Sequence, residues 1–241
     1  MPMCLVACVG EKQNVVLDTF LMGIKSQHTT IDEVSLNPNY RYLKVEVNGQ
    51  PALLVLGYQD RFPNGINDVW YSSFKEVVQL TGGRLTGTQG LDINWTEVTL
   101  YNVPALTDEK LFKEGTGTKP YTPVRFERVR TVMPSYRANI SETVELVALP
   151  GPPDDAPRAM RDQKDFPHLR WLQESVVMQT NVTSPYLSPL RAIYAIDSKT
   201  AQVIYGKQCL TTEFCISWLS WPFSKPEPTP ITKNSLEAKS N

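Results

Sequence analysis

The sequence predicts a mainly β fold, an antiparallel β-sandwich or open barrel with an amphipathic helix at its N-terminus. Residues 42–47 alternate apolar and polar side chains, which is the period of a strand with one buried face. Two pairs, Asn48-Gly49 and Gly82-Gly83, can take the positive φ angles of a two-residue hairpin turn. The chain also contains 19 prolines, a composition that favours short strands joined by turns over a helical bundle.

The 241-residue chain can bury one substantial core, so a single domain is the simplest organisation. We expect residual signal or lipobox sequence in residues 1–8, a single β-rich domain over 9–221 and a disordered, proline-rich tail over 222–241. Residues 150–167 contain five prolines and several charges, which predicts a long exposed loop. Residues 11–26 space their apolar side chains three and four positions apart, as in an amphipathic helix that packs on its own domain or docks on a partner.

Further strands are expected along the domain. The apolar run 52–56 predicts a strand covered on both faces, which pairs with 42–47 through the Asn48-Gly49 turn. A short helix is expected between 104 and 119, where apolar residues stand among charged ones. The remaining strands are expected at 97–103, 124–133, 136–149, 169–182, 190–196 and 201–210.

Charge and hydropathy argue against several partners. The 24 basic and 25 acidic residues nearly cancel, so the chain has no overall field to hold a nucleic acid. No run of 18 or more apolar residues occurs, so no membrane-spanning helix is expected. Residues 5–8, Leu-Val-Ala-Cys, look like the lipobox in which a bacterial lipoprotein receives its lipid, here on Cys8. Because only seven residues precede Cys8 and a signal peptide needs more, an ordinary buried or free cysteine is the alternative.

The most distinctive segment is residues 68–91, DVWYSSFKEVVQLTGGRLTGTQGL. A strand that opens with Trp70 leads to the Gly82-Gly83 turn, and an Arg-Leu-Thr strand follows. This run resembles the core signature of the group 4 capsule polysaccharide lipoprotein family, of the GfcB and YjbF type. In that family a Trp-x-Ser strand leads into Gly-Arg-Leu and Thr-x-Gly-Leu segments. The resemblance covers residues 10–105 well and residues 165–221 loosely.

The resemblance implies a bacterial lipoprotein anchored through Cys8 to the periplasmic face of the outer membrane. It also implies participation in the assembly or export of capsular polysaccharide or exopolysaccharide, beside an outer-membrane β-barrel export protein. A single acyl chain binds membranes reversibly, but a bacterial lipoprotein carries three and so stays anchored. We expect a non-enzymatic accessory or scaffold without a cofactor, and the alternative is a periplasmic glycan-binding or glycan-hydrolysing enzyme.

Cys209 and Cys215 are separated by five residues. This spacing allows a disulfide if residues 210–214 form a turn, and a periplasmic location would permit the bond. Two reduced, half-buried cysteines fit the same spacing. No metal site is expected, because neither His28 nor His168 neighbours a cysteine pair.

The common catalytic motifs are absent from the sequence, so no catalytic residue is expected. There is no Gly-x-Ser-x-Gly elbow, no phosphate-binding Gly-x-x-x-x-Gly-Lys loop and no His-Glu-x-x-His helix. His28 and His168 are expected to be surface residues rather than members of a catalytic triad. Acidic residues near aromatic ones could form the carboxylate pair of a glycosidase, although acids in β-loops are usually solvated. These acids are Asp60, Asp68, Asp92 and Glu97.

Aromatic residues near strand ends are candidate contacts for a glycan or a protein partner. Aromatic faces can stack on sugar rings while neighbouring polar groups bond the hydroxyls. The alternative is that these aromatic residues fill the core, which we expect for most of them. Arg84, in the Gly-Arg-Leu segment, is expected to lie along the hairpin surface. The candidate contacts are Tyr58, Trp70, Tyr71, Arg84 and Trp95.

Overall fold

The computed structural model describes residues 31–113, 121–162, 166–180 and 190–223. The strands in these ranges are β1 (Tyr42–Val47), β2 (Gln50–Phe62), β3 (Gly65–Tyr71), β4 (Val77–Thr81), β5 (Arg84–Gln89), β6 (Asn94–Tyr101), β7 (Val124–Met133), β8 (Arg137–Leu149), β9 (Leu169–Thr180), β10 (Arg191–Asp197), β11 (Gln202–Cys209) and β12 (Cys215–Trp221). Short helical turns are η1 (Ile31–Glu33), η2 (Glu109–Phe112) and α2 (Arg158–Arg161). The helix expected over residues 11–26 lies outside the described residues.

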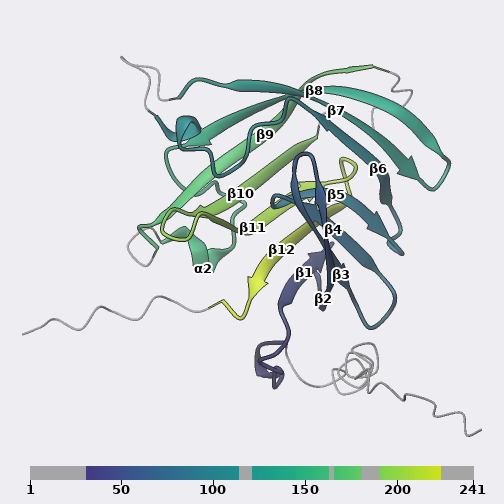
Figure 1. Ribbon diagram of the computed structural model, residues 1–241, viewed down its shortest axis with the longest axis vertical. Helices are drawn as coiled ribbons and strands as arrows, with labels where there is room; N and C mark the ends of the chain where they lie inside the picture. Colours follow the sequence, from purple (N-terminus) through teal and green to yellow (C-terminus); the bar gives the residue numbers. More distant parts are fainter. Residues whose placement is uncertain (1–30, 114–120, 163–165, 181–189, 224–241) are drawn as a thin grey trace, which may run out of the picture.

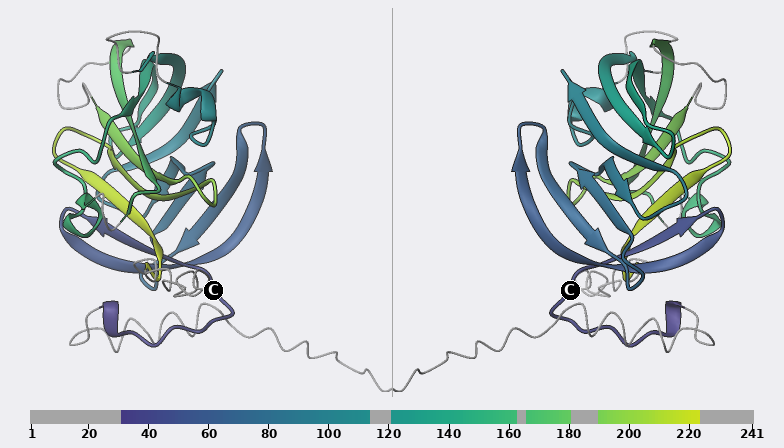
Figure 2. Two further views of the ribbon diagram at one scale, coloured as in Figure 1. Left: turned by 90° about the vertical axis from the view of Figure 1, so that its left-hand side faces the viewer. Right: turned by 90° about the vertical axis from the view of Figure 1, so that its right-hand side faces the viewer.

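All twelve strands belong to one antiparallel sheet, with the order β5-β4-β3-β2-β1-β12-β11-β10-β9-β8-β7-β6. The sheet curls until its two edge strands, β5 and β6, lie side by side (Figure 1), and Figure 2 shows this curl from two sides. The backbone N–H of Trp95 on β6 donates to Oγ1 of Thr88 on β5 at 3.0 Å. The predicted mainly β fold is confirmed, as a nearly closed, barrel-like sheet rather than a two-sheet sandwich.

Both predicted two-residue turns are present. Asn48 and Gly49 have φ angles of 47° and 82° and join β1 to β2, with Val47 opposite Gln50. Gly82 and Gly83 have φ angles of 56° and 85° and join β4 to β5. Two successive positive φ angles match the right-handed twist of the flanking strands. Local sequence therefore sets the register of both hairpins.

The strand expected to run from Trp70 to the Gly82-Gly83 turn is instead two strands. β3 ends at Tyr71, the chain turns through residues 72–76, and β4 begins at Val77. The Ser72 hydroxyl accepts hydrogen bonds from the backbone N–H groups of Phe74 and Glu76, at 3.0 and 3.1 Å. These bonds close a tight turn, because a serine side chain can substitute for a backbone acceptor.

The later strands follow the expected positions closely, except at the C-terminal end. β7 covers the expected residues 124–133, and β8 to β11 lie within three residues of their expected limits. β12 was not among the expected strands. It pairs with both β11 and β1, with Trp218 opposite Val45 on one side and opposite Gly206 on the other. β12 is therefore the strand that joins the N-terminal hairpins to the rest of the sheet.

The predicted short helix between 104 and 119 is one 3-10 turn, η2, within the described residues. Asp108 caps it, accepting a hydrogen bond from the Lys110 backbone N–H at 2.9 Å. Leu111 within this turn and Leu106 before it are buried and join the apolar core inside the curled sheet. The loop between β6 and β7 therefore covers part of the sheet interior.

The described residues of the proline-rich segment have many exposed side chains, but three apolar ones among them are buried. Ala156, Met160 and Phe166 are buried, and Ala156 and Met160 form a second apolar cluster with Trp171 on β9 and Tyr205 on β11. Short turns order the backbone, for example by a 2.9 Å bond from the Met160 N–H to the Pro157 carbonyl. Apolar residues spaced among the prolines were enough to cover the sheet.

The expected disordered tail starts at residue 222, and its first residues are described. Phe223 stacks on Phe166 with 5.2 Å between the ring centroids. Residues 224–241 lie outside the described residues.

Candidate functional site

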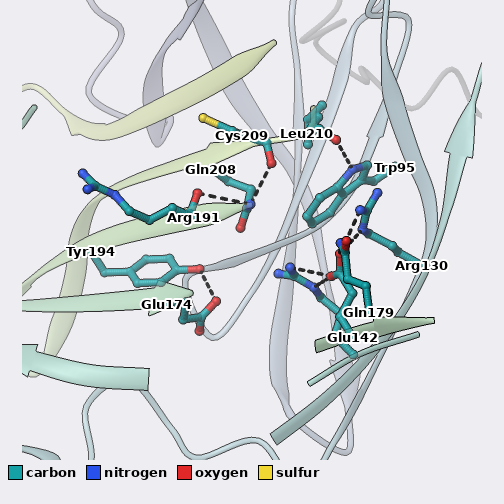
Figure 3. Close-up of polar contacts among 11 residues, drawn as sticks. Trp95, Arg130, Glu142, Glu174, Gln179, Arg191, Tyr194, Gln208, Cys209 and Leu210 are labelled. Atoms are coloured by element: carbon teal, nitrogen blue, oxygen red, sulfur yellow. Dashed lines mark hydrogen bonds and ion pairs between the residues drawn. The ribbon is translucent and has the colours of Figure 1, made fainter. Parts of the chain in front are cut away.

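Charged side chains lie inside the curled sheet, where a protein of this size normally holds apolar ones. Glu142 on β8 accepts hydrogen bonds from Arg128 at 2.6 Å, from Arg130 at 2.8 and 3.0 Å, and from Gln179 at 2.6 Å. Figure 3 shows Arg130 and Gln179 beside Glu142. The side chains of Glu142 and Arg130 are fully buried. Two guanidinium groups thus share a single carboxylate in a site that water does not reach.

The pKa values of this group reflect burial and mutual attraction. Burial opposes the charge on Glu142, but the positive charges of Arg128 and Arg130 and their hydrogen bonds lower the pKa of this carboxyl below its usual value. Burial lowers the pKa of Arg130. Burial also opposes the charge on Arg128, but the combined attraction of Glu142, Glu174 and Tyr194, with the hydrogen bond to Glu142, raises the pKa of Arg128. Glu142 is therefore ionised at neutral pH.

A second buried ion pair crosses the interior. Nε of Arg84 on β5 donates to Oε1 of Glu174 on β9 at 2.6 Å, and the Tyr194 hydroxyl donates to the other carboxylate oxygen at 3.1 Å. The Arg84 residue is 5% exposed. The expectation that Arg84 lies along the hairpin surface is therefore wrong, because the curl of the sheet turns this side of β5 inward.

Trp95 lies in the core and has no exposed surface. Its Nε1 donates to the Leu210 carbonyl at 3.2 Å (Figure 3), and the guanidinium carbons of Arg128 and Arg130 each lie 4.8 Å from the ring centroid. The ring faces are therefore occupied by protein. This arrangement fits the alternative of a core residue and leaves no face for a glycan.

The buried charged residues were not predicted from the sequence, although the alternation of the strands contains a signal for them. Along β8, Glu142 falls in step with the buried Ile140 and Val144, and along β9 Glu174 falls in step with Leu172 and Val176. A charged residue at an inward position of an alternating strand predicts a buried ionic group.

Trp70 and Arg84 come together at a cavity of about 620 Å³, which is lined by the N-terminal hairpins and by residues 103–107 and 201–203. Trp218 of β12, which was not a predicted contact, also lines it. Polar side chains of the lining include Arg41, Gln59, Asn64, Asp68 and Gln202, and Val203 of β11 adds an apolar one. A volume of this size is typical of small-molecule sites.

Three buried hydrogen-bond donors belong to residues that line this cavity. Nε1 of Trp70, Nη2 of Arg84 and Nε1 of Trp218 have no hydrogen-bond partner among the residues that the structure describes. A buried donor without an acceptor is costly, and such groups often mark functional sites. The cavity, with these donors, is the candidate functional site.

Polar groups at the rim of the cavity are paired with one another. Nε2 of Gln59 donates to Oδ1 of Asp68 at 2.6 Å, and Arg41 lies 4.0 Å from the other oxygen of that carboxylate. The Arg41 guanidinium also lies 5.7 Å from the Trp70 ring centroid. The charges of Arg41 and Asp68 therefore compensate each other.

Tyr58 and Tyr71 lie away from the cavity lining. Their ring centroids are 6.4 Å apart, and both side chains are partly exposed. The Tyr71 ring covers Gly57, where a Cβ atom would overlap it. Burial, with a smaller contribution from Tyr58, raises the pKa of the Tyr71 hydroxyl. These two tyrosines form a separate aromatic pair on β2 and β3.

The hydrogen bonds of the described residues do not connect the four candidate acids with one another. Asp60 and Asp92 are exposed, Asp68 bonds Gln59, and Glu97 accepts from Thr131 at 3.0 Å. His168 lies 4.0 Å from Asp197, and His28 lies outside the described residues.

Cys209 and Cys215 face each other across the end of the β11–β12 hairpin and are joined by a disulfide. Cys8 lies outside the described residues. Across the described ranges, no cluster of three or more His, Cys, Asp or Glu side chains is arranged to hold a metal. Nor does any helix in that part of the chain have the length and apolar character needed to cross a bilayer.

The architecture is similar to the crystal structure of the hypothetical lipoprotein YmcC from Escherichia coli (K12). The match has a TM-score of 0.53 at 18% sequence identity, and it covers 86% of this chain and 96% of that chain. The two proteins share a fold. No family model matches the sequence, and no curated protein matches it.

Proposed function

We propose that this protein is a lipoprotein of the outer membrane, facing the periplasm, that takes part in capsular polysaccharide or exopolysaccharide assembly or export. The observation that carries the proposal is the fold, which aligns with 96% of a hypothetical lipoprotein. The resemblance of residues 68–91 to the group 4 capsule lipoprotein family supports it independently. Those residues form β4 and β5 and most of β3, which contribute Trp70 and Arg84 to the cavity.

In this proposal, lipid on Cys8 holds the barrel-like domain at the membrane. Three acyl chains keep a lipoprotein anchored, whereas a single chain would exchange. The residues between Cys8 and the first described residue form the connection to the domain. The partner is an outer-membrane β-barrel export protein, which the domain contacts from the periplasmic side.

The proposed role is that of a non-enzymatic accessory. Glycoside hydrolysis needs a carboxylic acid and a carboxylate on either side of the substrate. The buried carboxylates Glu142 and Glu174 are both paired with arginines, which occupies their oxygen atoms. This pairing suits a structural role better than general acid catalysis.

The alternative function is a periplasmic glycan-binding or glycan-hydrolysing enzyme, and the cavity favours it. A hydrolase would need Asp68, the acid that lines the cavity, to act on a bound substrate. Release of reducing sugar from an oligosaccharide that is lost in Asp68→Asn would support the enzyme and contradict the accessory role.

Lipid attachment is tested in the bacterium that encodes the chain, with the gene expressed together with its genomic upstream sequence. Cells are fed an alkyne fatty acid, and the purified protein is examined for label and for its membrane fraction. We expect label in the outer-membrane fraction, lost in Cys8→Ser and retained in the matched control Cys4→Ser. An unlabelled wild-type protein in the soluble fraction would refute the anchor.

The pathway is tested by deleting the gene and measuring surface and periplasmic polysaccharide. We expect less polysaccharide at the surface, restored by the wild-type gene and by Cys4→Ser but not by Cys8→Ser. Unchanged polysaccharide in the deletion strain would refute a role in export.

A further inference from the structure

We propose that the cavity lined by Trp70, Arg84 and Trp218 binds a saccharide unit through its oxygen atoms. The inference rests on the proposed function, because it names the ligand that such an accessory would hold. It starts from the three buried donors at this cavity, which lack acceptors among the described residues. Folding alone gives no reason to collect three such groups, since each one costs stability.

The three donors come from separate parts of the sheet and are fixed by their neighbours. Trp218 lies over Gly206, whose missing side chain makes room for the indole ring. Arg84 is held by Glu174 through Nε, which leaves Nη2 without a bond to that carboxylate. Trp70 lies beneath Arg41. Packing thus holds the three side chains in place before any ligand arrives, which lowers the entropic cost of binding. It also covers their unpaired N–H groups, so neighbouring side chains must move for a ligand oxygen to reach them.

The turn between β4 and β5 closes one side of the cavity. A Cβ atom on Gly83 would overlap the Val203 side chain of β11. The absence of a side chain therefore lets the hairpin tip approach the opposite part of the sheet. Gly82, Gly83 and Val203 all line the cavity, so this contact forms part of its wall.

The chemistry of the lining favours hydroxyl oxygens as ligand atoms. Arg84 is neutralised by Glu174, and Arg41 lies beside Asp68. The site therefore offers N–H donors without a large excess of positive charge, which suits a sugar better than a phosphate. Gln59, Asn64, Asp68 and Gln202 can exchange hydrogen bonds with hydroxyls, and indole rings can contact the apolar face of a sugar.

A neutral sugar and a uronic acid both supply the required oxygen acceptors. Binding of the purified full-length chain is measured by isothermal titration calorimetry with cellotetraose and with a hyaluronan tetrasaccharide, which contains glucuronate. Binding of either probe supports the site, and the preferred probe shows whether hydroxyl or carboxylate oxygens are favoured. If neither probe binds at millimolar concentration, the inference is overturned.

Variants connect the binding to the three donors. Trp70→Phe and Trp218→Phe each keep a ring but remove the N–H, and we expect each to weaken binding roughly fivefold, as for one lost hydrogen bond. Arg84→Lys retains the charge beside Glu174 while removing Nη2, and we expect a similar loss. The matched control is Trp221→Phe, on the same strand as Trp218 but outside the cavity lining, with unchanged affinity.

Near-ultraviolet circular dichroism verifies that each variant is folded, and Trp70→Phe alone suffices for the test if another variant does not fold. Unchanged affinity in folded Trp70→Phe overturns the inference.

Failure of the site and failure of the proposed function are distinguishable. If the protein is lipidated and needed for export but binds neither probe, the proposed function stands and the sugar site is refuted. If it binds sugar but carries no lipid and its deletion leaves export unchanged, the sugar site stands and the proposed function is refuted.

Discussion

Arg130 and Glu142 face each other inside the sheet, with Nη2 of the arginine 2.8 Å from Oε1 of the glutamate and both side chains fully buried. They lie on adjacent strands, β7 and β8. Arg128, two residues before Arg130, bonds the second oxygen of the same carboxylate. The stability of this part of the sheet therefore depends on one negative charge that serves two positive ones.

Replacing Glu142 should strongly destabilise the protein. Glu142→Gln would leave two buried guanidinium groups without a counter-charge, and breaking such a group costs about 3–5 kcal/mol. The free energy of unfolding, measured by urea denaturation, should fall by about that amount. The matched control is Glu127→Gln on β7, an exposed glutamate that accepts a bond from Thr143, with an expected change within about 0.5 kcal/mol. Equal effects of the two substitutions would contradict the structural role of Glu142.

Low pH should weaken the contact between Glu142 and its two arginines. The pKa of Glu142 is lowered in the folded protein, so its charge adds stability above the unfolded value of about 4.3. This stability is lost as the pH falls through the lowered folded pKa. The difference in unfolding free energy between wild type and Glu142→Gln should therefore narrow from about pH 6 to about pH 3. A difference for Glu142→Gln that widens toward acid would be inconsistent with a lowered pKa.

Gly206 should not tolerate a side chain. A Cβ atom there would overlap the indole of Trp218, and overpacking of this kind typically costs about 1–3 kcal/mol. Gly206→Ala should lower the melting temperature and change tryptophan fluorescence, because Trp218 must move. In the control Gly87→Ala on β5, the new Cβ would meet only the flexible end of Gln79, with 3.1 Å to its nearest atom. A Gly206→Ala protein as stable as Gly87→Ala would show that the indole can move freely.

The Cys209–Cys215 disulfide should add stability because it reduces the number of conformations open to the unfolded chain. For a sequence separation of 6 residues, chain entropy gives about 2 kcal/mol. The double variant Cys209→Ser, Cys215→Ser should unfold at a lower urea concentration, with a free energy of unfolding reduced by about 2 kcal/mol. Adding a reducing agent should destabilise the wild type and leave the double variant unchanged. If the wild type is equally stable with and without reductant, the bond contributes nothing.

Local sequence patterns were sufficient to predict most of the strands. The alternation in β1, β7 and β8 and the positive-φ turns at Asn48-Gly49 and Gly82-Gly83 depend on neighbouring residues alone. The break after Tyr71 was missed because Ser72 closes a turn through its side chain. β12 alternates inward Ile216 and Trp218 with more exposed residues, but its place beside β1 depends on pairing with a strand some 170 positions away in the sequence.

The sequence by itself determined the mainly β class, two hairpins and the position of the two cysteines that the structure joins, because these follow from spacing and from the conformations open to glycine and asparagine. Only the tertiary structure decided which side chains share the interior. Arg84 and Glu174 are separated by 90 residues and meet because the sheet curls. The cavity likewise needs β3, β5 and β12 together, since no single strand can enclose a volume.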